Sequence, residues 1–347
     1  MKLLAKLTQT PGVAGREERI REVIKKEMTE ICDEVRSDAL GNLIGLKKGS
    51  GSGKIMLAGH MDEIGFLVKH IDDKGFIRLQ PVGGFDPRTL MNQRVVVHGT
   101  KDLTGNLAPA TSPIHILTEE EKKKELQIKD FFVDLGLSAE QVKEMVEVGD
   151  PVTLRQEFAQ IGDNYSSKAM DDRVGVLVML EAVKKLGDHR ADIYLVATVQ
   201  EEVGLRGALT SAFGIVPDQG IALDVTLAAD YPGAEEPEYV TRLGEGVAIK
   251  IMDSASISDH QLVKNLKEIA RKEKIPHQME ILPRGGTDAG VIQTTQAGVP
   301  VATLSVPCRY VHTVNEMVSH KDLEAAFNLL ASFLSNSDPG NITATGN

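Results

Sequence analysis

The sequence predicts an α/β protein in which a mostly β block interrupts the alternation of strands and helices. Three observations lead to this prediction. Buried-looking runs such as 192–199 and 300–306 alternate with amphipathic stretches such as 258–274, which is typical of α/β domains. Between residues 65 and 162 the pattern changes to short strands and turns. Polar residues of types that bind metals stand directly after several of the buried runs.

The composition limits the functions that the chain can have. Its 347 residues, 41% of them hydrophobic, predict about two domains with a large core. Aromatic residues make up 4% and Trp is absent, which disfavours stacking platforms for nucleic acid. The net charge of −11 disfavours nucleic-acid and anionic membrane partners. Two cysteines and no apolar run of about 18 residues lead us to expect a cytoplasmic protein without a disulfide framework.

The first 64 residues begin the alternation. Residues 17–32 place apolar side chains on one helical face, and residues 35–47 read as two strands joined by a turn. A loop rich in Gly and Ser follows at 48–54. The run 55–59 is expected to be a short buried strand, and it delivers His60 at its end.

The block from 65 to 162 is expected to form a second, inserted domain. A β-hairpin over 65–82, with its turn at 72–75, opens the block. The other elements expected here are a strand at 93–99, a solvated loop at 119–125, a capped helix at 138–148 and a strand at 150–155.

After residue 165 the alternation of strands and helices resumes. Helices are expected at 173–186, 205–213, 258–274, 287–296 and 319–334, and strands at 192–199, 220–224, 245–251, 278–282 and 300–306. Thr287 and Ser319 are expected to cap the last two helices. The polar residues 335–347 are expected to fray.

Residues of metal-binding types gather at the ends of the predicted strands. The candidates are His60, the adjacent Asp171 and Asp172 before a helix, the adjacent Glu201 and Glu202 after a strand, Asp224 and His312. Ligands of α/β proteins bind beyond the carboxyl ends of the strands, so these side chains are expected to meet. Imidazoles mixed with carboxylates suit Zn²⁺, Co²⁺ or Mn²⁺ better than Ca²⁺. The pattern therefore predicts a site for two divalent cations.

Such a site implies hydrolytic chemistry. A water bridging two metal ions roughly 3.5–4 Å apart becomes a nucleophile near neutral pH. Glu201, which adjoins the ligand Glu202, is predicted to take its proton as general base. Asp62 is predicted to accept the second ring N–H of His60. Each residue alone also fits an ordinary structural role, such as a helix cap or a solvated carboxylate, but their joint arrangement favours the metal site.

Six motifs of the chain resemble those of the M42 family of metallo-aminopeptidases, the tetrahedral aminopeptidases. They lie at 59–66, 169–175, 200–208, 222–226, 285–289 and 309–312. The resemblance covers nearly the whole chain. It implies a zinc-peptidase-like mixed sheet flanked by helices over 1–64 and 163–347, and it makes 65–162 a β-rich dimerisation domain.

The resemblance also implies a role for each site residue. The implied ligands are His60 and Asp224 for one ion, Glu202 and His312 for the other, and Asp171 as the bridge. A cis peptide bond would join Asp171 to Asp172, and which of the two bridges stays open because both fit the motif. Glu201 is implied as the general base, with Asp62 behind His60.

The family further implies an exopeptidase that removes N-terminal residues from short peptides. It implies two ions per subunit, Zn²⁺ or Co²⁺ with Mn²⁺ also compatible, and dimers that build a hollow tetrahedral dodecamer. One alternative is a glycoside hydrolase, because members also carry an endoglucanase label and paired carboxylates serve that reaction too. The absence of Trp argues against a sugar groove. Another alternative is a non-catalytic metal- or peptide-binding scaffold, against which the presence of Glu201 stands.

Three neighbouring features have open or minor roles. Residues 285–288 are expected either to form a pocket wall at a helix N-terminus or simply to cap the helix through Thr287. Cys308 is expected to be packed in the core. Arg309 is expected to pair with a carboxylate of the site.

Overall fold

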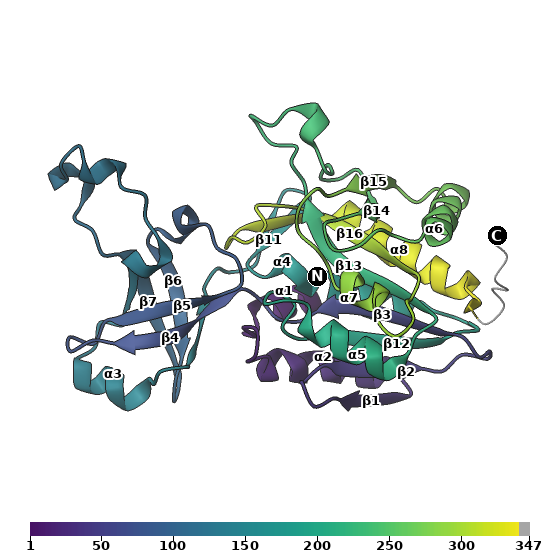
Figure 1. Ribbon diagram of the computed structural model, residues 1–347, viewed down its shortest axis with the longest axis horizontal. Helices are drawn as coiled ribbons and strands as arrows, with labels where there is room; N and C mark the ends of the chain where they lie inside the picture. The colour runs from purple at the N-terminus through teal and green to yellow at the C-terminus, as the bar shows by residue number, and fades with distance from the viewer. Residues whose placement is uncertain (340–347) are drawn as a thin grey trace.

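The computed structural model describes residues 1–339 and contains two β-sheets. One is an 11-stranded mixed sheet covered by helices, and the other is a closed six-stranded barrel that lies beside it (Figure 1). The α/β class and the β-rich second sheet are therefore confirmed. No helix among these residues is both long and apolar enough to cross a bilayer.

The large sheet has a parallel centre and antiparallel edges. Its main path is β1 (Glu34–Ser37), β2 (Leu43–Lys47), β12 (Asp192–Thr198), β3 (Lys54–His60), β13 (Gln219–Leu227), β16 (Val301–Arg309), β17 (Glu316–Ser319), β11 (Asn164–Ser167) and β10 (Ala159–Ile161). Beside β16, β14 (Val247–Met252) and β15 (His277–Ile281) form a branch. The four central strands, β12, β3, β13 and β16, run parallel to one another. Their carboxyl ends consequently meet at one edge of the sheet.

Helices cover both faces of this sheet. One face carries α1 (Lys2–Gln9), α2 (Glu18–Ile31), α4 (Met170–Lys184) and α8 (His320–Asn336), with α6 (His260–Glu273) packed against β14 and α8, and the other carries α5 (Arg206–Ile215) and α7 (Ala289–Gln293). Side chains of β3 alternate between the two faces: Ile55 and Leu57 join the larger core, whereas Met56 and Ala58 join the core under α5 and α7. Both cores therefore hold β3 in the middle of the molecule.

The barrel has its own hydrophobic core. Its strands are β4 (Gly65–Ile71), β5 (Ile77–Val82), β8 (Phe131–Asp134), β7 (Asp102–Pro109), β6 (Gln93–His98) and β9 (Pro151–Leu154). The hairpin turn is confirmed: the N–H of Gly75, at φ 89°, donates to the carbonyl of Asp72. The expected capping box of Ser138 and Gln141 is present at the start of α3 (Ala139–Met145). An arm over residues 110–130 projects from the barrel (Figure 1), and its charge run at 119–125 is exposed as expected.

Several local expectations differ from the structure. The helix α1 was not expected; it forms because Leu4 and Leu7 are fully buried against the larger core. The short strands β7, β8, β10, β11 and β17 were not expected either. Ser319 caps α8 by accepting the N–H of Lys321. That helix continues to Asn336, so the first expected tail residues are helical, while 340–347 lie outside the described residues.

The cap expected at Thr287 is wrong. The helix α7 spans only Ala289–Gln293, and no side-chain hydrogen bond caps it. The Thr287 hydroxyl instead lies 3.5 Å from Asp253 Oδ2 and 3.4 Å from the hydroxyl of Thr303. The Thr287 hydroxyl, which the local sequence predicts as a helix cap, therefore contacts two segments that are distant in the chain instead.

Candidate active site

The edge where the central strands end carries every candidate residue. They are His60 at the end of β3, Glu201 and Glu202 after β12, Asp224 within β13, His312 after β16, and Asp171 and Asp172 at the start of α4. The backbone turns sharply beside two of these positions, because Gln200, which precedes Glu201, and His312 adopt left-handed φ values of 55° and 62°. The peptide bond between Asp171 and Asp172 is cis, as the family resemblance implies.

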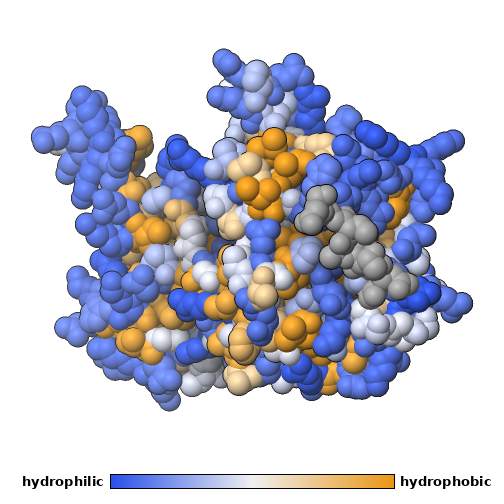
Figure 2. All heavy atoms as spheres, turned by 45° about the vertical axis from the view of Figure 1, so that its right-hand side comes forward, coloured by the Kyte–Doolittle hydropathy of each residue, from blue (hydrophilic) through white to orange (hydrophobic). Residues whose placement is uncertain are grey.

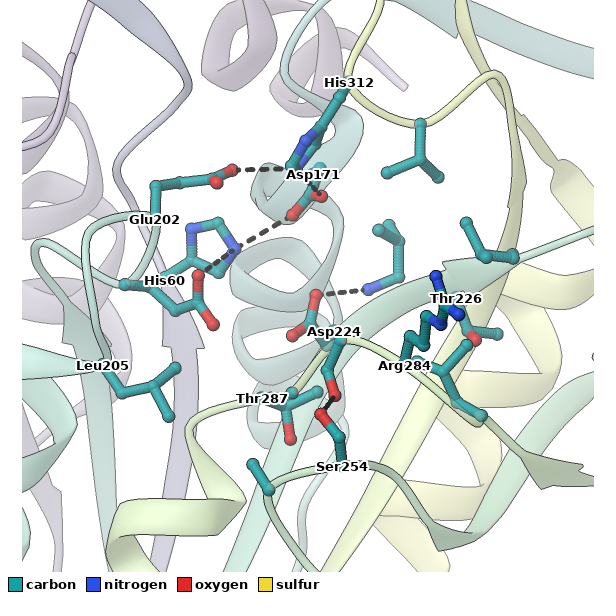
Figure 3. Close-up of a pocket in the computed structure, with 18 of the residues that line it drawn as sticks. His60, Asp171, Glu202, Leu205, Asp224, Thr226, Ser254, Arg284, Thr287 and His312 are labelled. Carbon is teal, nitrogen blue, oxygen red and sulfur yellow. Dashed lines mark hydrogen bonds and ion pairs between the residues drawn. The ribbon is translucent and has the colours of Figure 1, made fainter. Parts of the chain in front are cut away.

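Asp171 lies between the two imidazoles. Its Oδ1 is 2.9 Å from Nε2 of His60, and its Oδ2 is 3.4 Å from Nε2 of His312. Glu202 Oε1 lies 3.4 Å from the same nitrogen of His312 (Figure 3). His60, Asp171 and Glu202 each offer a ligand atom within 4.8 Å of the others. This spacing is compatible with a shared cation.

A second group of the same kind uses His60 with Asp172 and Asp224, again with ligand atoms within 4.8 Å of one another. Both oxygens of the fully buried Asp172 are engaged, because the N–H groups of His60 and Gly175 donate to them over 3.2 and 2.8 Å. A Cβ at Gly175 would approach Asp172 Oδ2 to 2.3 Å, so glycine is needed at this position.

Asp62 connects the ends of β3 and β12. It is fully buried, and its two carboxylate oxygens accept the N–H groups of Glu201 and Glu202 over 3.0 and 3.2 Å. Nδ1 of His60 lies 3.6 Å from this carboxylate and 3.2 Å from the backbone carbonyl of Asp62. The side chain therefore orients the two glutamates as well as facing the imidazole.

Four of the five carboxylates of the site, all but Asp171, are held in an unfavourable environment for their charge. Burial raises the pKa of Glu201, Asp172 and Asp224 well above the ordinary carboxyl range, and neighbouring carboxylates add to this effect. Burial acts against the charged form of His312 too, yet Asp171 and Glu202 outweigh it and raise its pKa to about 11. Without cations, protons must neutralise the excess of acidic groups.

This donor set fits divalent metal ions. Five carboxylates and two imidazoles converge here. Lys250 is a buried cation that lines the cavity, but it already pairs with Glu280 at 3.1 Å and with Asp253 at 3.4 Å. Mixed nitrogen and oxygen ligands are typical of Zn²⁺, Co²⁺ and Mn²⁺ sites. The excess of buried negative charge is the physical reason to expect cations here.

A cavity of about 590 Å³ opens beside these residues. Apolar side chains such as Leu205 and Leu282 line it together with Thr226, Ser254 and Arg284 (Figure 3). The pocket wall at 285–287 was expected from the sequence, and Leu205 and Thr226 belong to the motifs at 200–208 and 222–226. Ser254, Leu282 and Arg284 follow no motif and reach the cavity through folding.

Two expectations about neighbouring residues have different outcomes. Cys308 is fully buried and belongs to the larger core, as predicted. The pairing of Arg309 with a site carboxylate is wrong: its guanidinium donates two hydrogen bonds of 2.8 Å to Asp230, on a loop outside the site. Asp230 precedes a polar segment whose tertiary position the sequence did not indicate.

Sequence comparisons relate the whole chain to known peptidases. The profile of a family described as M42 glutamyl aminopeptidase matches residues 41–329. A protein of Acetivibrio thermocellus named provisionally as an aminopeptidase is 43% identical over 94% of this chain and 96% of its own length. The lysyl aminopeptidase of Pyrococcus furiosus is 36% identical over 98% of both chains.

Solved structures give the same relationship. The aminopeptidase APDkam598 of Desulfurococcus kamchatkensis superposes with a TM-score of 0.93 at 42% identity, covering 98% of this chain and 95% of its own. The TET1 peptidase of Pyrococcus horikoshii, which can assemble into a tetrahedron or an octahedral shell, has a TM-score of 0.86 at 34% identity, with coverages of 97% and 99%. An endoglucanase of Thermotoga maritima has a TM-score of 0.80 at 30% identity, with 96% of both chains covered. The chain therefore belongs to the M42 family of peptidases, and it is an exopeptidase of the aminopeptidase class.

Proposed function

We propose that the protein is a dinuclear-metal aminopeptidase that hydrolyses N-terminal residues from short peptides. The observation that carries this proposal is the position of Asp171 between His60 and His312, at 2.9 and 3.4 Å, inside a cluster with excess negative charge. When bound, two divalent cations supply Lewis acidity, which polarises a peptide carbonyl and lowers the pKa of water.

The proposed ligand set has Asp171 as the bridge. Its two oxygens face different imidazoles, whereas both oxygens of Asp172 already accept backbone N–H groups. Asp172 therefore suits a supporting role better than a bridging one. The proposed ligands are His60 and Asp224 for one ion, Glu202 and His312 for the other, and Asp171 for both.

Glu201 is the proposed general base. Its Oε2 lies 3.9 Å from Nε2 of His60, close to the proposed ions, and burial raises its pKa well above the usual range. A carboxylate that favours its protonated form can take a proton from water and return it to the leaving amine. Asp62 supports this role because it fixes the backbone N–H of Glu201 over 3.0 Å.

The two alternatives predict different activities. A glycoside hydrolase is suggested by the endoglucanase name of the Thermotoga maritima protein, but two imidazoles among the donors and the absence of Trp favour peptide hydrolysis. A non-catalytic scaffold would not need a free carboxylate such as Glu201 beside the metal ligands.

One experiment separates these alternatives. Metal-free protein is assayed on a panel of aminoacyl-chromophore substrates and on a cellulose oligosaccharide, with Zn²⁺, Co²⁺ or Mn²⁺ added back. We expect aminopeptidase activity that disappears with the metal and returns on its addition. Sugar hydrolysis instead, or no turnover with any of the ions, would refute the proposal. The panel also identifies the preferred N-terminal residue and the most active metal.

We also propose that the protein is cytoplasmic. In this proposal the segments 1–64 and 163–347 form the catalytic domain, and the block 65–162 is inserted between them. The protein would self-associate through this inserted block. Large apolar side chains of the arm are exposed, with Ile114 at 72% and Ile116 at 66%, and Ile114 also lines a groove of about 600 Å³. Figure 2 shows further apolar side chains gathered on the surface between the hydrophilic projections. Exposed apolar side chains that gather on a surface favour a protein–protein interface.

The proposed assembly is a tetrahedral dodecamer built from dimers, by analogy with the TET1 peptidase, which can assemble into a tetrahedron. Light scattering measures the mass directly against the 37.6 kDa chain. Replacement of Ile114 and Ile116 by Ser is expected to give smaller species. A monomer in the unaltered protein would contradict this proposal and leave the hydrolytic one intact.

A further inference from the structure

Glu316 contacts two residues of the site through their backbone. It is the first residue of β17 and is 2% exposed. Its Oε1 accepts the N–H of His312 over 2.7 Å, and its Oε2 accepts the N–H of Asp171 over 3.1 Å. One buried carboxylate thus joins the segment of His312 to that of Asp171, which lies 145 residues before Glu316 in the chain.

The sheet fixes Glu316 on both sides. Met317 of β17 pairs with Arg309, the last residue of β16, and Glu316 itself lies opposite Ser167 of β11. The strand β16 leads to His312, and β11 leads to Asp171. The two hydrogen bonds of Glu316 therefore close a ring that contains both site residues and is anchored in three strands.

The imidazole of His312 is less enclosed than that of His60. The His60 side chain is 3% exposed, so packing holds its imidazole, whereas the His312 side chain is 36% exposed. His312 also has a left-handed φ of 62°, which is uncommon for a residue with a side chain. The hydrogen bond of its N–H to Glu316 holds the backbone from which the imidazole extends towards Asp171 and Glu202.

We propose that Glu316 is a positioning residue that presets His312 and Asp171 to receive the second metal ion. This inference rests on the proposed dinuclear function. Two acceptor oxygens are required, because each holds a different N–H group. A glutamine offers one acceptor oxygen, and its NH₂ group would face the N–H of the other residue. A carboxylate is therefore the side chain that satisfies both.

The test compares metal binding by Glu316→Gln, Glu316→Asp and the unaltered protein, each in the metal-free form titrated with Zn²⁺ in a calorimeter. For Glu316→Gln we expect the ion held by Glu202 and His312 to bind about 10–100-fold more weakly, and the other ion, which shares only Asp171 with the ring, to lose less affinity. Glu316→Asp keeps two acceptor oxygens but withdraws them, so an intermediate loss is expected. Glu324→Gln, on an exposed part of α8, is the matched control and should bind both ions normally.

A purely structural role makes a different prediction. Glu316→Gln would then melt at a lower temperature without metal yet bind both Zn²⁺ ions with unaltered affinity, and that result would overturn the inference. If Glu316→Gln does not fold, unaltered affinity in Glu316→Asp counts against the inference in the same way. An unaltered protein that binds no metal would instead refute the proposed function, so the two failures can be distinguished.

Discussion

Two buried clusters of charged groups lie next to each other in this protein and differ in how their charge is balanced. The first is the acid-rich site around Asp171 and Asp224. The second, which we call the anchor cluster, consists of Glu63, Lys168 and Arg173. Lys168 Nζ lies 2.5 Å from one oxygen of Glu63, and Arg173 Nη2 lies 3.7 Å from the other.

The chain itself supplies the cations of the anchor cluster. Two cations face the single carboxylate of Glu63, and Arg173 Nη1 also donates to the carbonyls of Leu7 and Thr10, over 2.5 and 2.9 Å. Burial of charge is tolerated when partners are present in this way. In the site, carboxylates exceed the cations that the chain supplies. The difference indicates that the anchor cluster holds structure and that the site is built to receive cations.

The largest expected effect is the loss of turnover in Glu201→Gln. The amide keeps the size of the side chain but cannot accept a proton from water, so kcat should fall about 10²–10⁴-fold or more. The variant should still bind two metal ions, measured by elemental analysis. Glu30→Gln, on the exposed side of α2, is the control. A kcat within tenfold of the unaltered enzyme would exclude Glu201 as the base.

The next effect is on stability and breaks the balance of the anchor cluster. Arg173→Met removes two hydrogen bonds to the N-terminal segment and one cation from Glu63. Lys168 still pairs with Glu63, but the carbonyls of Leu7 and Thr10 lose a charged donor, so the free energy of unfolding of the metal-free protein should fall by about 3–5 kcal/mol. Urea unfolding measures it. Lys184→Met, at a partly exposed pair with Glu27, should lose about 1 kcal/mol or less. Similar losses in both variants would show that the cluster has no special role.

A third effect concerns a buried carboxyl that forms no ion pair with any of the residues 1–339. Glu17 is 3% exposed, and burial raises its pKa to about 7 despite the N–H groups of Gly15 and Gln200. Because the folded state holds the proton more tightly, the stability due to this group is present below about pH 4.5 and is lost as the pH rises through 7.

Glu17→Gln should remove this dependence, since the amide oxygen can still accept both N–H groups. Relative to the unaltered protein, the variant should gain about 3 kcal/mol between pH 4.5 and 7.5. Urea unfolding across that range measures the difference. Glu18→Gln, at the exposed neighbouring position, should leave the pH profile as it is. A flat difference between Glu17→Gln and the unaltered protein would contradict the prediction.

The smallest effect is expected at an exposed ion pair. Arg19 donates two hydrogen bonds of 2.9 Å to Asp102, and the two side chains are 54% and 47% exposed. The hydrogen bond from Arg19 is the first cause that lowers the pKa of Asp102 to about 2, so the stabilisation is lost as the pH falls from about 4 towards 2.

Asp102→Asn should therefore cost about 0.2–1 kcal/mol at pH 7, and less in high salt. A loss of stability as large as that of Arg173→Met would mean that an exposed ion pair contributes as much as the buried anchor cluster. Thermal unfolding in low and high salt is sufficient to decide this.

Several parts of the fold and the site could be predicted because they follow from periodicity and residue type. The strands ending at His60 and before Glu201 are continuous apolar runs, and parallel strands bring their ends to one edge. The helix α1 was missed because only eight residues form it and its burial depends on α4. The strand β17 was missed because it has four residues and owes its conformation to pairing with β11 and β16.

By itself, the sequence determined the α/β alternation, the β-rich character of the block 65–162 and the set of residues that stand at strand ends. Only the tertiary structure decided what each polar group contacts. Asp171 lies between two imidazoles, and Asp172 accepts backbone N–H groups instead. Glu316 accepts the N–H groups of both Asp171 and His312. The physical reason is that periodicity sets the face and the end of an element, whereas the partners of a buried polar group come from segments far away in the chain.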